Sequence, residues 1–334
     1  MANLAQLAQL KQGADAWNTW RQANKGTHID LTGADLGDAH LDKIDLSGAD
    51  LNGADLNCAE LVGADLTFAI LTKANLHAAN LCKAQFYGAN LFGADLSHAK
   101  LKSANLHEMN LVGQMFLCAD LTGAAVNNSD LTGANLSGAI LTDASFSIAN
   151  LSGANLNDAI LSGTDFSNAN LSCVDLGNTH WDRSKMRGRY LGVRGLDSCF
   201  GNALFKRAAA DQDFLDSLEY QWRDSKWWRF VFRMWGWLDF GRSISRVAAL
   251  GLGIVGLFAA IYWANPALLN TAQSAHSWFT PFYFSIVTFT TLGFGDVRPA
   301  QTLAEILTSL EVVLGYLNLG LLLAVLAEKI ARRS

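Results

Sequence analysis

The sequence predicts a square β-helix in its first half and an α-helical membrane pore domain with a re-entrant loop in its second half. Three observations predict this: a five-residue apolar repeat from Leu31 to Trp181, two long apolar segments near the C-terminal end, and a change in the sign of the charge. Residues 29–181 carry 17 acidic and 5 basic residues, a net of −12, whereas residues 182–334 carry 17 basic and 12 acidic, a net of +5. A hydrophobic content of 50% excludes a disordered chain.

The repeat runs through 31 consecutive units without a change of register; its centre is Leu in 25 of them, and Ala stands two positions earlier in 23. A five-residue step would spread these leucines around every face of a helix and alternate them between the two faces of a strand. A chain that turns a corner every five residues sends each Leu inward, and four corners close one coil. Coils stacked about 4.8 Å apart by β-type hydrogen bonds give a rod of roughly 37 Å.

The motif Ala, Asp or Asn, Leu and two variable residues resembles the pentapeptide-repeat family over about 150 residues, and the resemblance implies a right-handed quadrilateral β-helix. The bore admits one Leu and one small residue on each side, so larger residues overpack it. We therefore predict local bulging at four departures from the pattern. These are Met109, Gln114, Val126 and Val174.

Both ends of such a rod need caps, because an end coil exposes unpaired backbone groups. Residues 1–28 are expected to form an N-terminal capping helix, with an amphipathic stretch from Leu4 to Asn24. Residues 182–221 are expected to form a C-terminal cap and linker that contains a helix over about 202–221. Residues 222–242 combine Trp with Lys or Arg at every third or fourth position, which predicts an amphipathic helix in the membrane interface.

Residues 243–334 form the predicted membrane domain. The apolar segments 244–263 and 302–330 are each long enough to cross a hydrocarbon core of about 30 Å. Between them, residues 276–299 begin with a short apolar run and end in a Gly-x-Gly turn. This segment is too broken for a third span, so we interpret it as a re-entrant helix and loop, buried in protein or lining water.

The loop that follows the short apolar run, TTLGFGD from Thr290 to Asp296, resembles the selectivity filter of potassium channels, usually TTVGYGD. The resemblance implies a homotetramer of the two-helix class, in which four subunits stack backbone carbonyls into cages for K⁺. It also implies that the slide helix of related channels corresponds to residues 222–242; a passive anchor is the alternative. The resemblance assigns ion binding to Thr291, Leu292, Gly293, Phe294 and Gly295, and the outer mouth to Asp296.

The filter departs from the family in two side chains. Leu292 replaces Val, and Phe294 replaces Tyr and so loses a hydroxyl that would tie the filter to the pore helix. Phe284, seven residues before Thr291, also offers no donor, and Val287 stands where some relatives place a buried Glu. We expect an apolar collar around four K⁺ sites; a non-selective cation channel is the alternative.

The second apolar segment carries three features. Gly315 lies where the resemblance implies a gating hinge, and close helix packing is the alternative. A carboxylate inside an apolar helix is usually functional, so we expect Glu311 to brace the pore helix through Ser285 or Thr288. A protonated side chain bonded to backbone is the alternative for Glu311. Gly315 stands twenty residues after Gly295, and the same distance in sequence from the filter predicts four pore-lining residues, Tyr316, Leu319, Leu323 and Ala327.

The remaining predictions concern location and partners. Lys and Arg precede the first span and follow the second, so the positive-inside rule places both termini and the rod in the cytoplasm of an inner membrane. Expected partners are membrane lipid, further copies of the chain, and an unknown cytosolic protein or ligand on the rod. No cofactor is expected besides K⁺ as the permeant ion. The five cysteines contain no CxxC pair, which fits a reducing compartment.

Two other functions deserve comparison. Some acidic pentapeptide-repeat proteins mimic DNA and bind topoisomerase, and a net charge of −12 permits that alternative. The acidic residues recur at one repeat position, however, as the fold itself would place them, and we expect no nucleic-acid partner. An enzyme is not expected, because the histidines are scattered without metal-binding or triad spacing.

Overall fold

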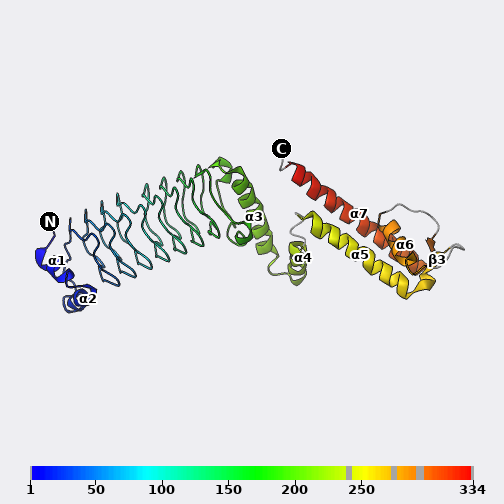
Figure 1. Ribbon diagram of the computed structural model, residues 1–334, viewed down its shortest axis with the longest axis horizontal. Coiled ribbons are helices and arrows are strands. Elements are labelled where there is room, and N and C mark those ends of the chain that lie inside the picture. The colour runs from blue at the N-terminus through cyan, green and yellow to red at the C-terminus, as the bar shows by residue number, and fades with distance from the viewer. Residues whose placement is uncertain (1, 238–242, 272–276, 291–296, 332–334) are drawn as a thin grey trace. The chain divides into compact units, whose positions relative to one another are not determined.

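A computed structural model describes residues 2–237, 243–271, 277–290 and 297–331. The chain divides into two compact units, Met1–Gln221 and Trp222–Ser334. The first unit contains two N-terminal helices, a stack of coils and a final helix (Figure 1). Its elements are α1 (Leu4–Leu10), α2 (Ala14–Ala23), β1 (Asp175–Leu176), η1 (Arg183–Lys185), η2 (Leu196–Ser198), β2 (Phe200–Gly201) and α3 (Ala203–Trp222).

The coils between α2 and β1 are the predicted square β-helix. Parallel backbone bridges join residues that are 20 positions apart, for example Asp30 to Asp50, so four pentapeptides make one turn of the coil. The apolar centre and the small residue before it both point inward; Leu56 and Ala54, for example, are fully buried. The predicted fold class is therefore confirmed, and the core is a single column of Leu, Phe and Ala along the axis.

Each corner of the coil is a four-residue turn. In the first, Ala34 N donates to Leu31 O at 3.0 Å, and Gly33 has a φ of +64°. A positive φ at the third position is the feature of a type II turn, which favours glycine. Many corners hold another residue at this φ, such as Cys58 at +56°. The stacked coils on both sides hold these residues in a conformation that they rarely adopt alone.

The acidic residues of the rod close these corners. Asp120 Oδ1 accepts hydrogen bonds from Thr122 N at 3.1 Å and from Thr122 Oγ1 at 2.6 Å, and Lys102 Nζ lies 3.2 Å from Asp120 Oδ2. Burial raises the pKa of Asp120, but the hydrogen bonds from Thr122 and Lys102 outweigh it and hold this pKa below its ordinary value. The negative charge of the rod is thus largely a by-product of turn formation.

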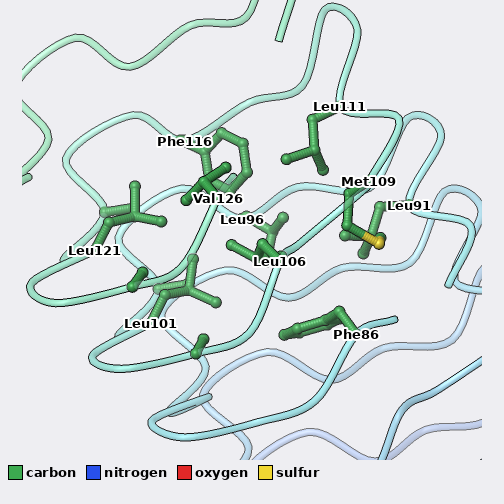
Figure 2. Close-up of a cluster of buried hydrophobic side chains, with 14 of the residues drawn as sticks. Phe86, Leu91, Leu96, Leu101, Leu106, Met109, Leu111, Phe116, Leu121 and Val126 are labelled. Atoms are coloured by element: carbon green, nitrogen blue, oxygen red, sulfur yellow. The ribbon is translucent and has the colours of Figure 1, made fainter. Parts of the chain in front are cut away.

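The predicted bulging occurs near Met109 and Gln114. Within the described coils no bridge joins Asn90 to Asn110, although Asn90 is bridged to Ile70 and Asn110 is bridged to Asp130. The Gln114 side chain is buried, and its Nε2 donates to Ala94 O at 2.5 Å. In the regular coils the carbonyl at this repeat position accepts a hydrogen bond from a backbone N–H; Ala99 O, for example, accepts from Asp120 N. Figure 2 shows the buried side chains of this region, where Met109 shares the bore with Leu and Phe residues.

The same prediction is wrong at the other two departures. Val126 N donates to Ser145 O at 2.8 Å, and Phe200 N donates to Val174 O at 2.8 Å, so the ladder stays regular at both residues. Valine is smaller than the Leu that it replaces at position 126, and at position 174 one extra branch fits the bore. Local opening therefore depends on the length of the side chain, since Met109 and Gln114 both carry long unbranched side chains.

The N-terminal cap consists of two helices rather than the single predicted helix. The chain turns at Gly13, which has a φ of +103° and is costly for other residues to replace. This turn lays α2 on the first coil, where the Asn18 side chain acts as a substitute strand. Asn18 Nδ2 donates to Lys43 O at 2.9 Å, and Asn18 Oδ1 accepts from Asp45 N at 2.8 Å.

Gln6 on α1 makes the same pair of bonds at the next side of the first coil. Its Nε2 donates to His28 O at 2.8 Å, and its Oε1 accepts from Asp30 N at 2.9 Å. A primary amide offers a donor and an acceptor in the spacing of a peptide group. Two such amides therefore satisfy an edge that would otherwise recruit another chain.

The coil continues past the predicted end at Trp181. Residues 182–201 form one irregular further coil, in which Asn170 pairs with Arg194 and β1 pairs in parallel with β2. Helix α3 begins one residue after Asn202, whose Oδ1 accepts from Phe205 N at 3.0 Å. The helix agrees with the segment expected from the sequence, but the sequence pattern did not indicate the extra coil.

Carboxylates of α3 cap this last coil. Asp216 Oδ1 accepts from Gly188 N at 2.9 Å, and Asp216 Oδ2 accepts from Tyr190 N at 3.3 Å. Asp213 Oδ1 accepts from Gly192 N at 2.7 Å. Burial raises the pKa of Asp216, although these backbone donors act in the opposite direction. The two ends of the rod are thus closed by different polar groups.

The second unit contains two long apolar helices with a short helix between them in the chain. The helices α5 and α7 are the two described helices long and apolar enough to cross a membrane, and Figure 1 shows them side by side with α6. The elements are α4 (Lys226–Trp237), α5 (Ile244–Ala264), η4 (Pro266–Leu268), β3 (Leu269–Thr271), α6 (Thr280–Phe289), β4 (Val297–Pro299) and α7 (Thr302–Ala331).

Helix α4 begins four residues later than the interfacial helix expected over residues 222–242. Helix α3 extends to Trp222, and Ser225 then starts α4 by accepting from Trp228 N at 3.3 Å. Trp227 and Trp228 are exposed, with 66% and 44% of their surfaces accessible. Exposed tryptophans on a strongly amphipathic basic helix are typical of membrane-interface segments.

We predict that Gln114→Ala closes the opening between residues 90 and 110. Alanine restores the small residue of the motif and frees Ala94 O for a backbone donor. Hydrogen exchange of the full-length protein, followed by mass spectrometry, should slow at the amides of residues 110–115 by about tenfold, the effect of one added hydrogen bond. Thr164→Ala is the matched control, because Thr164 occupies the same repeat position and its Oγ1 also donates to a carbonyl, Leu141 O at 2.9 Å, while the next backbone donor, Asp165 N, keeps its bond to Ala144 O. Faster exchange in Gln114→Ala would show that the side chain stabilises the coil.

Candidate ion-conducting site

The predicted filter lies outside the described residues, so the site is defined by the elements that hold its two ends. Helix α6 ends at Phe289 immediately before it, and β4 begins at Val297 immediately after it. The predicted ion-binding and outer-mouth residues that lie outside the described ranges are Thr291, Leu292, Gly293, Phe294, Gly295 and Asp296.

A short antiparallel pair anchors the far end of the filter segment. Strand β4 pairs with β3, and the register places Leu269 opposite Pro299 and Thr271 opposite Val297. Ala300 N also donates to Leu268 O at 2.9 Å. The segment after the filter is therefore tied to the chain that leaves α5. The sequence pattern did not predict this pair, because each strand is only three residues long.

Helix α6 holds the near end of the filter segment. Pro281 occupies the first turn, where its missing N–H costs nothing, and Thr290 N donates to Ile286 O at 2.9 Å at the C-terminus. The predicted support residue Phe284 is buried and packs edge-to-face on Tyr262 of α5, with ring centroids 5.1 Å apart. Val287 is half-buried. Because the filter itself is not described, the apolar collar stays a prediction.

The predicted brace Glu311 is fully buried between the three helices. Ser285 Oγ of α6, one of its two expected partners, lies in hydrogen-bond contact with Glu311 Oε1. Tyr262 Oη of α5 lies 3.2 Å from Glu311 Oε2. The contact with Tyr262 was missed by the sequence analysis, because nothing in the local pattern shows which face of α5 meets α7.

Gly315 has a packing reason that the structure makes explicit. A Cβ atom at Gly315 would overlap Phe289 O and stand 3.1 Å from Phe289 C. The C-terminal backbone of α6 therefore lies directly against α7 at this glycine. This is the close-packing alternative; the gating hinge stays a prediction.

Asn318 is a second polar tie between the long helices. It is buried, and its Nδ2 donates to Val247 O of α5 at 3.0 Å. Gly251 makes room for it, because a Cβ there would stand 2.8 Å from Asn318 Oδ1. Sequence reasoning missed this residue, although an Asn within an apolar span was an available signal.

The predicted pore-lining residues lie on exposed parts of α7. Tyr316, Leu319 and Leu323 expose 60%, 51% and 57% of their surfaces, and Ala327 is also exposed. Tyr316 and Leu319 help to line a cavity of about 260 Å³ beside the end of α6. In a single chain, pore-lining and lipid-facing residues are both exposed, so the pore-lining role stays a prediction.

Comparison with known families identifies both units. Residues 249–332 match the ion channel family model. Eight copies of the pentapeptide-repeat model match residues 29–67, 59–97, 69–108, 119–147 and 149–188. The chain thus carries pentapeptide repeats and an ion channel domain, and the described part of the second unit contains two helices long and apolar enough to cross a membrane.

Solved structures similar to about half of the chain include pentapeptide-repeat proteins. HetL, which is involved in heterocyst differentiation regulation in Nostoc sp. strain PCC 7120, is 24% identical over 55% of this chain and 95% of its own, with a TM-score of 0.32. QnrB1, a plasmid-mediated fluoroquinolone resistance protein, is 19% identical over 54% and 88%, with a TM-score of 0.37. A thylakoid-lumen protein of Arabidopsis thaliana is 27% identical over 49% and 89%, with a TM-score of 0.16. No match was found among curated protein sequences.

We predict that Gly315→Ala destabilises the membrane unit, whereas Gly320→Ala does not. The methyl group at position 315 meets Phe289 backbone, and such overpacking costs about 1–3 kcal/mol. At Gly320 a Cβ would meet no atom within 4 Å, so alanine gains about 1 kcal/mol of helix propensity. Thermal unfolding of the two variants in detergent checks this. Equal stability with altered channel opening would instead support the hinge.

Proposed function

We propose that the chain is one subunit of a homotetrameric potassium-selective channel that passes K⁺ down its gradient. The observation that carries the proposal is the TTLGFGD segment, which joins α6 to β4 inside the ion channel domain. Glycines at positions 293 and 295 allow the positive φ values that align successive carbonyls toward one axis. Four copies would complete the oxygen cages, which is why one chain is insufficient.

The exposed surface of α7 supports the need for further copies. Large apolar side chains such as Leu310, Val313 and Leu317 expose about half or more of their surfaces in the single chain. Lipid covers part of such a surface, and helices of neighbouring subunits cover the rest. The face that contains Tyr316, Leu319, Leu323 and Ala327 lines the ion path in this proposal.

The rod takes a regulatory or assembly role in this proposal. Basic residues flank the start of the first span and the end of the second, which by the positive-inside rule favours a cytoplasmic location at the inner membrane for both termini and for the rod. Helix α4, which follows the rod in the sequence and carries exposed tryptophans, rests in the membrane interface in this proposal. Most acidic residues of the rod stand at the one repeat position from which Asp closes a corner, which favours a protein or ligand partner over nucleic-acid mimicry.

Ion flux into liposomes containing the purified protein tests the selectivity. We expect flux of K⁺ far above that of Na⁺, and loss of this flux in Gly293→Ala, because a methyl group disturbs the carbonyl ladder. Equal flux of Na⁺ and K⁺ would support the non-selective alternative, through the changed packing of Leu292 and Phe294. A dimer in detergent would contradict the tetrameric pore.

Removal of residues 1–221 tests the role of the rod, because this boundary separates the two compact units. We expect the shortened protein to change either the yield of tetramer or the open probability in planar bilayers. A rod that regulates the pore changes open probability at constant tetramer yield; a rod for assembly changes the yield alone. If both quantities stay the same under all conditions, the rod has neither role.

A further inference from the structure

The hydroxyl of Ser285 makes two contacts that compete for one hydrogen. Ser285 Oγ lies 2.9 Å from Val255 O of α5 and in hydrogen-bond contact with Glu311 Oε1 of α7. A backbone carbonyl only accepts, so the contact with Val255 requires the hydrogen of Ser285. The contact with Glu311 then requires a hydrogen from the carboxyl group. Both contacts are satisfied together only when Glu311 is a neutral acid.

The other surroundings of Glu311 agree with a neutral acid. Its second oxygen, Oε2, accepts from Tyr262 Oη, so the carboxyl group has one accepting and one donating oxygen. Among the described residues, Tyr262 is the one titratable group that interacts with Glu311. The group that contacts Glu311 from α6 is the neutral hydroxyl of Ser285. No cation among the described residues interacts with Glu311. An ionised carboxylate buried in a membrane without a cation is very unfavourable.

We propose that Glu311 works as a neutral carboxylic acid that heads a hydrogen-bond chain from α7 through Ser285 of α6 to Val255 of α5. These hydrogen bonds position the pore helix, α6. When Glu311 loses its proton to solvent hydroxide, Ser285 turns its hydrogen to the carboxylate, and two bare oxygens then face each other at Val255. The contact between α6 and α5 weakens, so ionisation of this acid lowers conduction. The effect on conduction rests on the proposed channel function; the protonation state does not.

Infrared spectroscopy of the full-length protein in lipid tests the protonation state directly. At neutral pH we expect the carbonyl band of a protonated carboxylic acid, present in the wild type and absent in Glu311→Gln. Glu305→Gln is the matched control, since Glu305 is exposed six residues earlier on α7, and it should leave the band intact. Absence of the band from the wild type overturns the proposal.

Potassium flux as a function of pH tests the positioning role in the same samples. Glutamine reproduces one donor and one acceptor, so Glu311→Gln should conduct at neutral pH and lose the fall in flux that the wild type shows at alkaline pH. Glu311→Ala leaves Ser285 without its donor and should conduct about tenfold less, the effect of one buried hydrogen bond. If Glu311→Gln conducts as poorly as Glu311→Ala, the acid is needed as an anion and the proposal fails. An infrared band without any K⁺ flux would overturn the channel function and support the neutral acid.

Discussion

Buried backbone N–H and C=O groups need partners, and both units of this protein are organised around that need. In the rod, every regular coil supplies backbone partners to the coils on both sides of it, so unpaired backbone groups are confined to the two ends. At one end the amides of Gln6 and Asn18 imitate a missing strand. At the other end the carboxylates of Asp213 and Asp216 accept from backbone N–H groups. Neither end presents an open edge to another chain along these sides.

The membrane unit meets the same requirement with side chains that reach across helices. Ser285 and Asn318 both donate to backbone carbonyls of α5, at Val255 and Val247. Such bonds are retained because water is absent from the hydrocarbon core. They also fix the rotation of α6 and α7 against α5, which apolar contacts alone specify weakly. The end of α6, where the filter segment starts, is positioned by these few polar contacts and by the absence of a side chain at Gly315.

Small residues set the spacing in both units. Alanine at the repeat position leaves the bore just wide enough for Leu, and the coil opens near Met109 and Gln114, where longer side chains stand instead. Glycine at position 251 leaves room for the Asn318 amide. In each case the backbone or polar group of a neighbour occupies the volume of a missing side chain. Close packing of this kind explains why isolated departures from a repeat have local effects in the rod.

The sequence by itself determined the features that depend on short-range periodicity and composition: the 20-residue coil, the column of Leu and Ala, and the two long apolar helices with the TTLGFGD segment between them. Only the tertiary structure decided the break at Gly13, the irregular coil of residues 182–201, the pairing of β3 with β4, and the contacts of Tyr262 and Asn318. Each of these depends on partners far apart in the chain or on strands too short to leave a pattern. In a repeat, every unit of the sequence specifies the register of the coil. A single polar contact between helices, by contrast, is specified only when both helices are in place.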